Sequence, residues 1–342
     1  MSTVSDSTYS LQDKVDFLSN PKIYPATTVE VLETHMSYIF FADQFVYKLK
    51  KPVLYDFLDF RSKASRYFFC MEELRINQPL ASDTYLDVVP LTFSDHGFSL
   101  DGKGDMIDWL VKMKRLPKEY MLDKAIERGL ASNDRVEDAA EMLVGFYMTS
   151  AANRISAHHF RQQFIREIEL NSVELLRKEF NLEKSAVVRI PTDLLHFVFN
   201  YANYFDERVS RSRIVDGHGD LRPEHICLAP KPVIIDRIEF NTNLRVLDVA
   251  EELSFLALEC EILNSPAVGQ IFLKVYETKS YDKIPKELIN FYKAKRAFLR
   301  AKLSIHHLLE KRYQTEKQKW INRCNNYLAA ARVYCDRLPK KS

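Results

Sequence analysis

The chain has 342 residues, of which 46% are hydrophobic and 28% charged, so it is long enough for two lobes with a sizeable core. Its 49 basic and 47 acidic residues give a net charge of +2, which provides no electrostatic argument for a nucleic-acid or membrane partner. No apolar run approaches the ~18 residues of a membrane span, and the N-terminus lacks a basic-then-apolar leader. The five cysteines are scattered without C-x-x-C spacing, so we expect reduced thiols and a cytoplasmic protein.

The first third of the chain is predicted to be mainly β-structure. A short helix is expected over residues 11–18, where apolar residues fall at i, i+4 and i+7. Residues 29–53 are rich in β-branched and aromatic side chains, which predicts a hairpin with its turn at residues 42–44. Further along we predict a helix at residues 62–78 closed by Pro79, and strands at residues 85–91, 98–100 and 106–114.

This part of the chain contains two pairs of charged residues, and periodicity does not distinguish the two members of either pair. Lys48 and Lys50 lie two residues apart in a predicted strand, so both point to the same face. Glu72 and Glu73 flank the apolar stripe of the predicted helix on either side. A solvated basic edge strand and solvated helical glutamates are the alternative interpretation of both pairs.

After Pro117 the chain is predicted to be almost entirely helical. Adjacent histidine pairs in this region face different ways on a helix and make poor metal sites. The predicted helices cover residues 121–128, 136–148, 156–180, 191–210 and most of 255–338.

The helical pattern is interrupted by residues 214–236, IVDGHGDLRPEHICLAPKPVIID. Two short apolar runs at residues 226–228 and 233–235 flank a proline-containing turn, which predicts a hairpin. The loop HGDLRPEH precedes the first strand, and Asp236 follows the second. A loop aspartate followed by a hairpin that ends in another aspartate is typical of kinase-type folds.

The loop HGDLRPEH at residues 218–225 resembles the HGD form of the catalytic loop in the aminoglycoside phosphotransferase family. It is also similar to the H-R-D-L-K-P-E-N loop of protein kinases. The resemblance extends over approximately residues 25–305, through the segments YKLKKPV, EELRIN, WLVKMKRLP and IIDRIEFN. The chain looks like a less characterised bacterial branch of this family. Some relatives continue into an additional P-loop kinase-like domain, and we expect this chain to end before one.

The resemblance implies roles for the loop and for the aspartate after the hairpin. Asp220 would accept or orient the proton of the substrate hydroxyl, and Arg222 would offset charge on the transferred phosphoryl group. His218 belongs to the same loop and is the third candidate catalytic residue. Asp236 would take the place of the aspartate that holds magnesium between the β- and γ-phosphates.

The resemblance also implies a nucleotide site in the first lobe. Lys48 would grip the phosphates, because V-Y-K is most similar to the family's V-A-I-K strand, with Lys50 as the second choice. Glu73 fits the family's helix pattern better than Glu72 and would orient the lysine. The strand at residues 106–114 would lead into the hinge, where backbone groups of Lys112 and Met113 meet the adenine. An ordinary edge strand with no ligand is the alternative interpretation of this segment.

The sequence departs from the family pattern at two places. The family has a metal-binding asparagine five residues after the catalytic aspartate, where this chain has His225, and imidazole is a poor magnesium ligand. Either one metal suffices, or His225 has another function, or the loop does not catalyse; we keep His225 with Asp236 as a candidate metal residue. No glycine-rich phosphate loop occurs, and residues 34–37 (THMS) either supply hydroxyl donors in its place or are simply strand.

Two acids follow the hairpin at the start of a predicted helix. Asp248 matches an aspartate of the family, while Glu252 stands where a second aspartate is usual. Because an acid at a helix N-terminus is favoured by the helix dipole whatever the function, we interpret both as structural supports.

Together these features predict an α+β, two-lobed protein-kinase-like fold. Residues 1–115 would form a β-rich N-lobe that covers the nucleotide, and residues 116–342 a larger helical C-lobe with the catalytic loop and the acceptor cleft. The expected reaction transfers the γ-phosphoryl group of ATP, with magnesium, to a hydroxyl of a small molecule. The acceptor specificity lies in the helical region, where no motif identifies the acceptor.

Two alternative functions stay open at this point. The first is a nucleotide-binding pseudokinase that regulates a protein partner, which His225 and the missing glycine loop motivate. The second is a metal-dependent phosphohydrolase with His218, Asp220, His225 and Asp236 as ligands, which leaves the lysine and the helical glutamate without a role.

Overall fold

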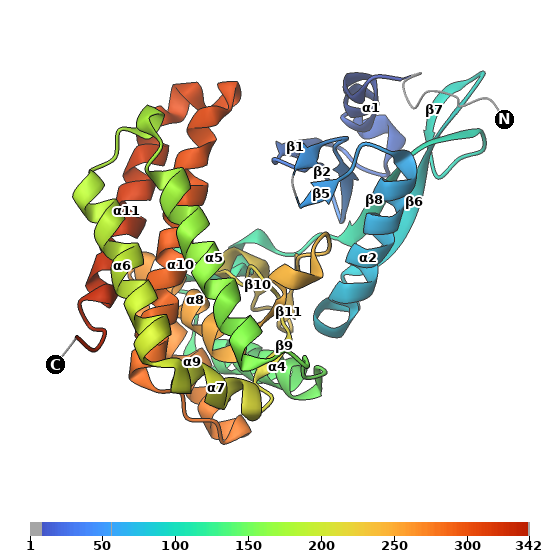
Figure 1. Cartoon of the computed structure of the whole chain (residues 1–342). Coiled ribbons are helices and arrows are strands. Elements are labelled where there is room, and N and C mark those ends of the chain that lie inside the picture. Colours follow the sequence, from blue (N-terminus) through green and yellow to red (C-terminus); the bar gives the residue numbers. More distant parts are fainter. Residues whose placement is uncertain (1–8, 56, 341–342) are drawn as a thin grey trace. The chain divides into compact units, whose positions relative to one another are not determined.

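A computed structural model describes residues 9–55 and 57–340 of the chain (Figure 1). By compactness the chain divides into two units. The first unit contains the residues up to Ala131 together with Glu224–Arg245, and the second contains Ser132–Pro223 together with the residues from Val246 onward. The predicted lobe boundary at residue 115 remains a prediction.

The first unit is built on a six-stranded antiparallel sheet in the order β1-β2-β3-β8-β6-β7. A central position between β3 and β6 gives β8 a paired neighbour on each side. The strands are β1 (Val29–Glu33), β2 (Ser37–Ala42), β3 (Phe45–Lys50), β6 (Tyr85–Ser94), β7 (Gly97–Leu100) and β8 (Asp105–Lys114).

Helices α1 (Leu11–Leu18) and α2 (Lys63–Ala81) contribute to two different apolar clusters of this sheet. Val15 of α1 belongs to the cluster that contains Tyr47, whereas Cys70 of α2 belongs to the cluster that contains Val46. Because successive strand residues point to opposite faces, β3 sends alternate side chains to the two helices. The face of β3 that carries its lysines is therefore the face toward α2.

Three details of this unit differ from the sequence-based prediction. The expected hairpin over residues 29–53 consists of three strands, because residues 34–36 turn the chain between β1 and β2. Helix α2 continues to Ala81 with Pro79 inside its last turn, where the missing N–H removes one hydrogen bond without ending the helix at once. A short pair, β4 (Leu54–Tyr55) and β5 (Leu58–Asp59), lies between β3 and α2.

The first unit is completed by η2 (Lys118–Tyr120), helix α3 (Leu122–Glu127), the hairpin of β10 (Ile226–Cys227) and β11 (Val233–Ile234), and η5 (Thr242–Leu244). The pairing of Ile226 with Ile234 confirms the hairpin predicted from the two apolar runs. Met121 forms an isolated bridge with Cys227, so β10 is held beside the start of α3.

The second unit is helical, apart from a two-stranded ladder of β9 (Ile214–Asp216) and β12 (Val246–Asp248). β9 comes before and β12 directly after residues 224–245, the segment of the chain that belongs to the first unit. The helices are α4 (Asn133–Thr149), α5 (Ala157–Leu175), α6 (Lys184–Asn200), α7 (Ala202–Ser210), α8 (Val249–Ile262), α9 (Pro266–Ser280), α10 (Lys286–His306) and α11 (Lys317–Cys335).

Helix α6 begins earlier than predicted. The sequence pattern placed the start at Pro191, but the helix begins at Lys184 and contains Pro191. It ends at Asn200, so the predicted helix over residues 191–210 is two helices, α6 and α7. The buried residues Val187 and Ile190 of the first turns explain the early start, because they extend the apolar face that packs in the core.

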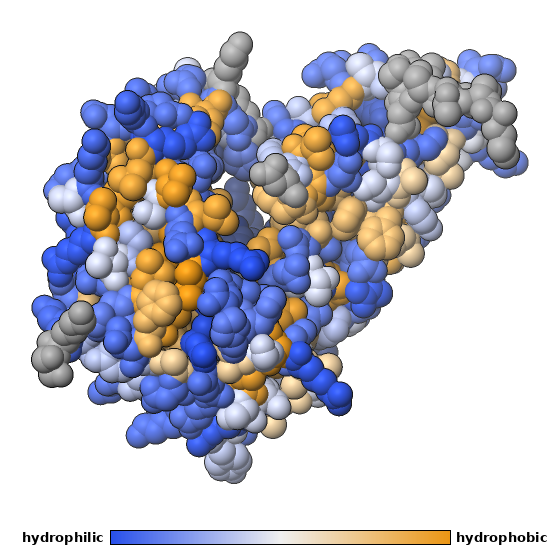
Figure 2. Space-filling model, viewed as in Figure 1, coloured by the Kyte–Doolittle hydropathy of each residue, from blue (hydrophilic) through white to orange (hydrophobic). Residues whose placement is uncertain are grey.

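The α+β fold class is confirmed, with a β-rich first unit and a helical second unit. Within the described residues, none of the helices combines the length and the apolar character needed to cross a membrane. On the face seen in Figure 2, hydrophobic side chains reach the surface in patches between hydrophilic ones. Apolar atoms contribute more than half of an ordinary protein surface, so these patches carry no assignment by themselves.

Candidate active site

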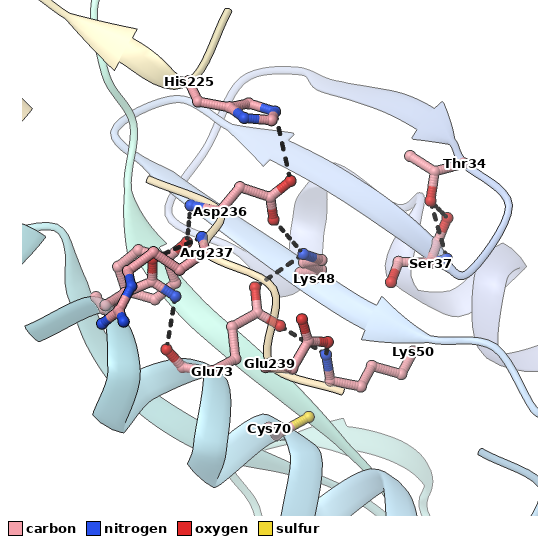
Figure 3. Close-up of polar contacts among 12 residues, drawn as sticks. Thr34, Ser37, Lys48, Lys50, Cys70, Glu73, His225, Asp236, Arg237 and Glu239 are labelled. Carbon is pink, nitrogen blue, oxygen red and sulfur yellow. Dashed lines mark hydrogen bonds and ion pairs between the residues drawn. The ribbon is translucent and has the colours of Figure 1, made fainter. Parts of the chain in front are cut away.

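Lys48 lies at the centre of a group of charged side chains in the first unit (Figure 3). Its Nζ donates a hydrogen bond to Glu73 Oε1 at 2.8 Å and to Asp236 Oδ1 at 2.9 Å. Three elements that are distant in the sequence thus meet at one amine: strand β3, helix α2 and the segment after β11. The resemblance implied the contact between the strand lysine and the helical glutamate, and the structure adds the contact with Asp236.

The second lysine of β3 also contacts the helical glutamate. Lys50 Nζ donates to Glu73 Oε2 at 2.6 Å and forms an ion pair with Glu239. Each oxygen of the Glu73 carboxylate therefore holds one lysine. Both lysines point to the same face of β3, as the two-residue period predicted. The two lysines differ in their second partner, which is Asp236 for Lys48 and Glu239 for Lys50, and the assignment of Lys48 to the phosphates stays a prediction.

The structure selects Glu73 over Glu72 as the partner of the lysines. Glu73 is fully buried, whereas Glu72 forms an ion pair with the exposed guanidinium of Arg75. Helix α2 begins after Ser62, whose hydroxyl accepts the backbone N–H of Ser65. The packing of α2 on the sheet then turns Glu73 inward.

The charges explain how these groups keep their ionised forms in a buried place. Burial alone would lower the pKa of Lys48, but the carboxylates of Asp236 and Glu73 outweigh it and hold this pKa well above its usual value. Burial would likewise raise the pKa of Glu73, but the two lysines lower it below its usual value. The lysine amine and the glutamate carboxylate are therefore both charged near neutral pH.

Asp236 has a left-handed backbone conformation, with φ of +66°. Aspartate tolerates this region better than most residues, and such conformations in non-glycine residues gather at functional sites. Its backbone N–H donates to the hydroxyl of Tyr85 at 3.0 Å, and its side chain is 45% exposed. One carboxylate oxygen faces Lys48, and the other lies 3.7 Å from Nε2 of His225. This carboxylate is held in place and still open to solvent.

A buried asparagine ties helix α2 to the segment after Asp236. The backbone N–H of Arg237 donates to Asn77 Oδ1 at 3.1 Å, and Asn77 Nδ2 donates to the carbonyl oxygen of Glu73 at 2.8 Å. The guanidinium of Arg237 also binds the carbonyl oxygen of Ile76. Asn77 thus uses its amide to fix the segment beside Glu73.

Residues 218–223 of the loop HGDLRPEH lie in the second unit, where Glu252 holds the start of the loop. The carboxylate of Glu252 accepts the backbone N–H of His218 at 2.9 Å and of Gly219 at 2.6 Å, and the hydroxyl of Tyr147 at 2.7 Å. Burial raises the pKa of Glu252, while these donors act in the opposite direction. A Cβ at Gly217 would lie 2.8 Å from Glu252 Oε2, so the loop approaches the carboxylate too closely for a side chain there.

The three candidate catalytic residues of the loop have different environments. The side chain of Asp220 is 31% exposed, and its Oδ2 accepts a hydrogen bond from Arg222 Nε at 3.0 Å. His218 is fully buried, and its Nδ1 accepts the backbone N–H of Asp220 at 3.4 Å. Arg296 of α10 donates to the carbonyl oxygen of Gly219 at 3.3 Å. Asp220 and Arg222 are therefore the two accessible groups, while His218 supports the loop from inside.

No family model matches the chain. An uncharacterized protein of Mycobacterium tuberculosis is 31% identical over 278 residues, which are 80% of this chain and 54% of that protein. A protein of Mycobacterium bovis shows the same identity and the same coverage. The chain thus spans about half the length of the curated relatives it matches.

Solved structures identify the fold. A thermostable mutant of an aminoglycoside phosphotransferase, in a ternary complex with AMP-PNP and hygromycin B, matches with a TM-score of 0.51 and 11% sequence identity. The match covers 93% of this chain and 98% of that chain. The chain has the aminoglycoside phosphotransferase fold. A choline/ethanolamine kinase family protein from Mesorhizobium loti has a TM-score of 0.48 and 13% identity, with 94% and 98% coverage. The resemblance predicted from the loop sequence is confirmed at the level of the fold.

The turn between β1 and β2 is the place where the phosphotransferase family usually holds phosphates. Here residues 34–37 form a tight turn, in which the N–H of Ser37 donates to Thr34 Oγ1 at 3.0 Å and the N–H of Thr34 donates to the carbonyl oxygen of Ser37 at 2.8 Å. Lys51 Nζ donates to the carbonyl oxygen of Thr34 at 2.7 Å. Residues 34–36 are a turn and Ser37 begins β2, so the continuous strand that is the alternative interpretation is interrupted here.

The predicted hinge residues lie within the sheet. Lys112 has partner residues on β3 and on β6, and Met113 is buried in the cluster that also contains Val46. Adenine contact through their backbones stays a prediction. An open cavity lies at the end of β8, lined by residues that include Gln44, Lys114 and Leu116.

Sequence reasoning missed several residues that build this site. Glu239, Asn77 and Tyr85 contact the lysine, the helix or the aspartate only because of the fold. For Glu239 the sequence carried one usable signal, because this acidic residue stands between Ile238 and Phe240, three residues after Asp236. The interpretation of Glu252 as a structural support agrees with its contacts, because its carboxylate accepts two backbone N–H groups of the loop HGDLRPEH.

Proposed function

We propose that this chain is an ATP-dependent phosphotransferase that moves the γ-phosphoryl group to a hydroxyl of a small molecule. The observation that carries the proposal is the placement of Lys48 between Glu73 and Asp236, at 2.8 and 2.9 Å. A buried lysine that stays charged, oriented by a helical glutamate, is suited to bind phosphate oxygens. The exposed carboxylate beside it is suited to bind the cation that accompanies the nucleotide.

The donor set fits magnesium at Asp236 and not at His225. Magnesium prefers oxygen ligands and keeps several waters, so one exposed carboxylate together with phosphate oxygens satisfies it. Asp236 would hold the ion, and when bound it would neutralise charge on the phosphates. Imidazole is a poor ligand for this cation. In the described part of the chain, no three His, Cys, Asp or Glu side chains are grouped to hold a metal by themselves.

The catalytic loop supplies the acceptor side of the proposed reaction. Asp220 is the general base that accepts or orients the hydroxyl proton, because its carboxylate is exposed and held by Arg222. Arg222 offsets charge on the transferred group. His218 positions the loop from its buried place and does not itself transfer a proton. Acceptor binding is assigned to the helical unit, and the acceptor is a small molecule with a hydroxyl group.

The proposal is tested by nucleotide binding and by turnover, measured separately. Binding of magnesium-ATP is measured by calorimetry, and ADP release is measured with a panel of hydroxyl compounds. Lys48→Met is expected to weaken binding at least about tenfold, because a hydrogen bond to a charged group contributes about 1.5–3 kcal/mol, whereas Asp220→Asn is expected to bind normally and to lose turnover. Lys103→Met, an exposed lysine in the turn before β8, is the matched control. Wild-type protein that binds neither ATP nor GTP with magnesium would contradict the proposal.

One observation favours the pseudokinase alternative. Nε2 of His225 lies 3.7 Å from Asp236 Oδ2, on the carboxylate that would hold the metal. A pseudokinase would bind nucleotide but release no ADP with any acceptor, and Asp220→Asn would change nothing. His225→Asn, which restores the family's residue, would then be expected to raise metal-dependent binding.

A further inference from the structure

Lys50 and Glu239 form a second, deeply buried ion pair behind the lysine that we assign to the nucleotide. The side chain of Lys50 has no exposed surface, and that of Glu239 is 8% exposed. Together with Asp236, Lys48 and Glu73 they form a row of alternating charges in which each side chain forms an ion pair with the next (Figure 3). The order is Asp236–Lys48–Glu73–Lys50–Glu239. The family resemblance implies a single lysine–glutamate pair, so the last two members are additional.

The order of charges in this row has a consequence for Lys48. Glu73 carries one negative charge and contacts two lysines, one through each oxygen. If Lys50 had no other acid, it would draw on the charge of Glu73 and compete with Lys48. Glu239 supplies that other acid, and one carboxylate per lysine then remains even when Asp236 is occupied by a cation. A buried cation that loses its partner is strongly destabilising, so this competition would not be weak.

The environment of Glu239 supports this arrangement. It faces Lys48 and Lys50 on β3 and Glu73 and Cys70 on α2. Burial raises the pKa of its carboxyl group, and Lys50 acts in the opposite direction. A carboxylate in such a place needs a cation partner to be retained, and Lys50 is that partner.

We propose that Glu239 and Lys50 are positioning residues for Lys48: Glu239 neutralises Lys50, which leaves the carboxylate of Glu73 free to orient Lys48 toward the phosphates. This inference rests on the proposed function, because the nucleotide is assigned to Lys48 there. It adds two residues to the binding machinery that neither the loop motif nor the fold identifies.

A comparison of a single and a double variant tests the charge argument. In Glu239→Gln the charge of Lys50 is left with Glu73 alone, and we expect magnesium-ATP to bind about 10- to 100-fold more weakly, by analogy with the loss of a partner that orients a metal ligand. In Lys50→Met/Glu239→Gln both charges are gone, Glu73 is again available to Lys48, and affinity is expected to return to near the wild-type value. A merely structural pair would make the double variant at least as weak as the single one, which would overturn the proposal.

A second measurement needs no nucleotide. The side chain of Lys48 is 14% exposed and that of Lys50 is not exposed, so an acylating reagent followed by mass spectrometry reports on Lys48. In Glu239→Gln the amine of Lys48 is held less firmly by Glu73 and meets the reagent more often, so its labelling is expected to be faster, and the double variant is expected to label like wild type. Equal labelling rates in the wild type and Glu239→Gln would refute the inference. If the variants show the expected labelling rates but the wild-type protein binds no nucleotide, only the proposed function is refuted.

Controls separate these effects from misfolding. Glu239→Asp keeps the charge, and its affinity and labelling rate are expected to lie between those of the wild type and Glu239→Gln. It takes the place of Glu239→Gln if that variant does not fold, and wild-type behaviour of the double variant beside an impaired Glu239→Asp would support the proposal. Glu127→Gln, which removes an exposed ion pair with Lys124 in the same unit, is the matched control and should leave both readouts unchanged.

Discussion

Replacement of Glu252 by glutamine is expected to loosen the catalytic loop and to destabilise the helical unit. Glutamine has nearly the same shape, but one of the two oxygens becomes an NH2 group that donates hydrogen bonds. If the remaining oxygen replaces Oε2, the bonds from His218 and Tyr147 persist without charge assistance, while the N–H of Gly219 faces another donor. The loop that carries Asp220 would then lose one of its anchors.

The magnitude follows from the three bonds. Loss of charge assistance in two hydrogen bonds costs about 0.5–1.5 kcal/mol each, and a buried N–H without an acceptor costs about 1–3 kcal/mol. Part of this cost is offset, because burial raises the pKa of Glu252 and glutamine does not carry the penalty for a buried charge. We therefore expect a net loss of about 2 kcal/mol in the free energy of unfolding, a large share of the ~5–15 kcal/mol typical of a folded protein.

Urea unfolding and amide hydrogen exchange measure the two parts of this expectation. The urea midpoint should fall with an unchanged m-value, and the amides of His218 and Gly219 should exchange faster than those of neighbouring core residues. Glu169→Gln, at an exposed position of α5, serves as the control. An unchanged midpoint together with unchanged protection of these two amides would show that Glu252 does not hold the loop.

Three further predictions concern other parts of the molecule. Gly269→Ala should lower the thermal midpoint, because its Cβ would lie 2.6 Å from the backbone of Ala257 where α8 and α9 pack together; normal stability would mean that the helices can separate at no cost. Burial would raise the pKa of Asp282, but its ion pair with Arg208 lowers it below the usual 3.8, so its contribution to stability is present above that pH and is lost as the pH falls through the lowered value. Thermal unfolding from pH 6 to pH 3 should therefore show the difference between wild type and Asp282→Asn shrinking toward the acid end, and a constant difference would contradict the pairing. Asn77→Leu should weaken magnesium-ATP binding more than it lowers stability, which calorimetry and urea unfolding on the same variant distinguish; an unchanged affinity would remove the link between α2 and the metal-binding segment.

Features that depend on neighbouring residues follow from the amino-acid sequence alone. The loop HGDLRPEH, the hairpin after it and the alternation of Val46, Lys48 and Lys50 are local patterns, and the structure contains each of them. The family resemblance of the loop also led to the fold, because a short motif with fixed spacing constrains the elements around it. Even the structural interpretation of Glu252 followed from its place at the start of a helix.

Which charged side chains meet depends on how the elements pack together. A helical period sets the angle between Glu72 and Glu73 but not the face that packs on the sheet, so the buried glutamate is known only once α2 is placed. Lys50 and Glu239 are 189 residues apart, and no local pattern relates them. Ion pairing in a buried place depends on the distance between the charges and on the exclusion of water. Both are properties of the packed chain and not of the order of its residues.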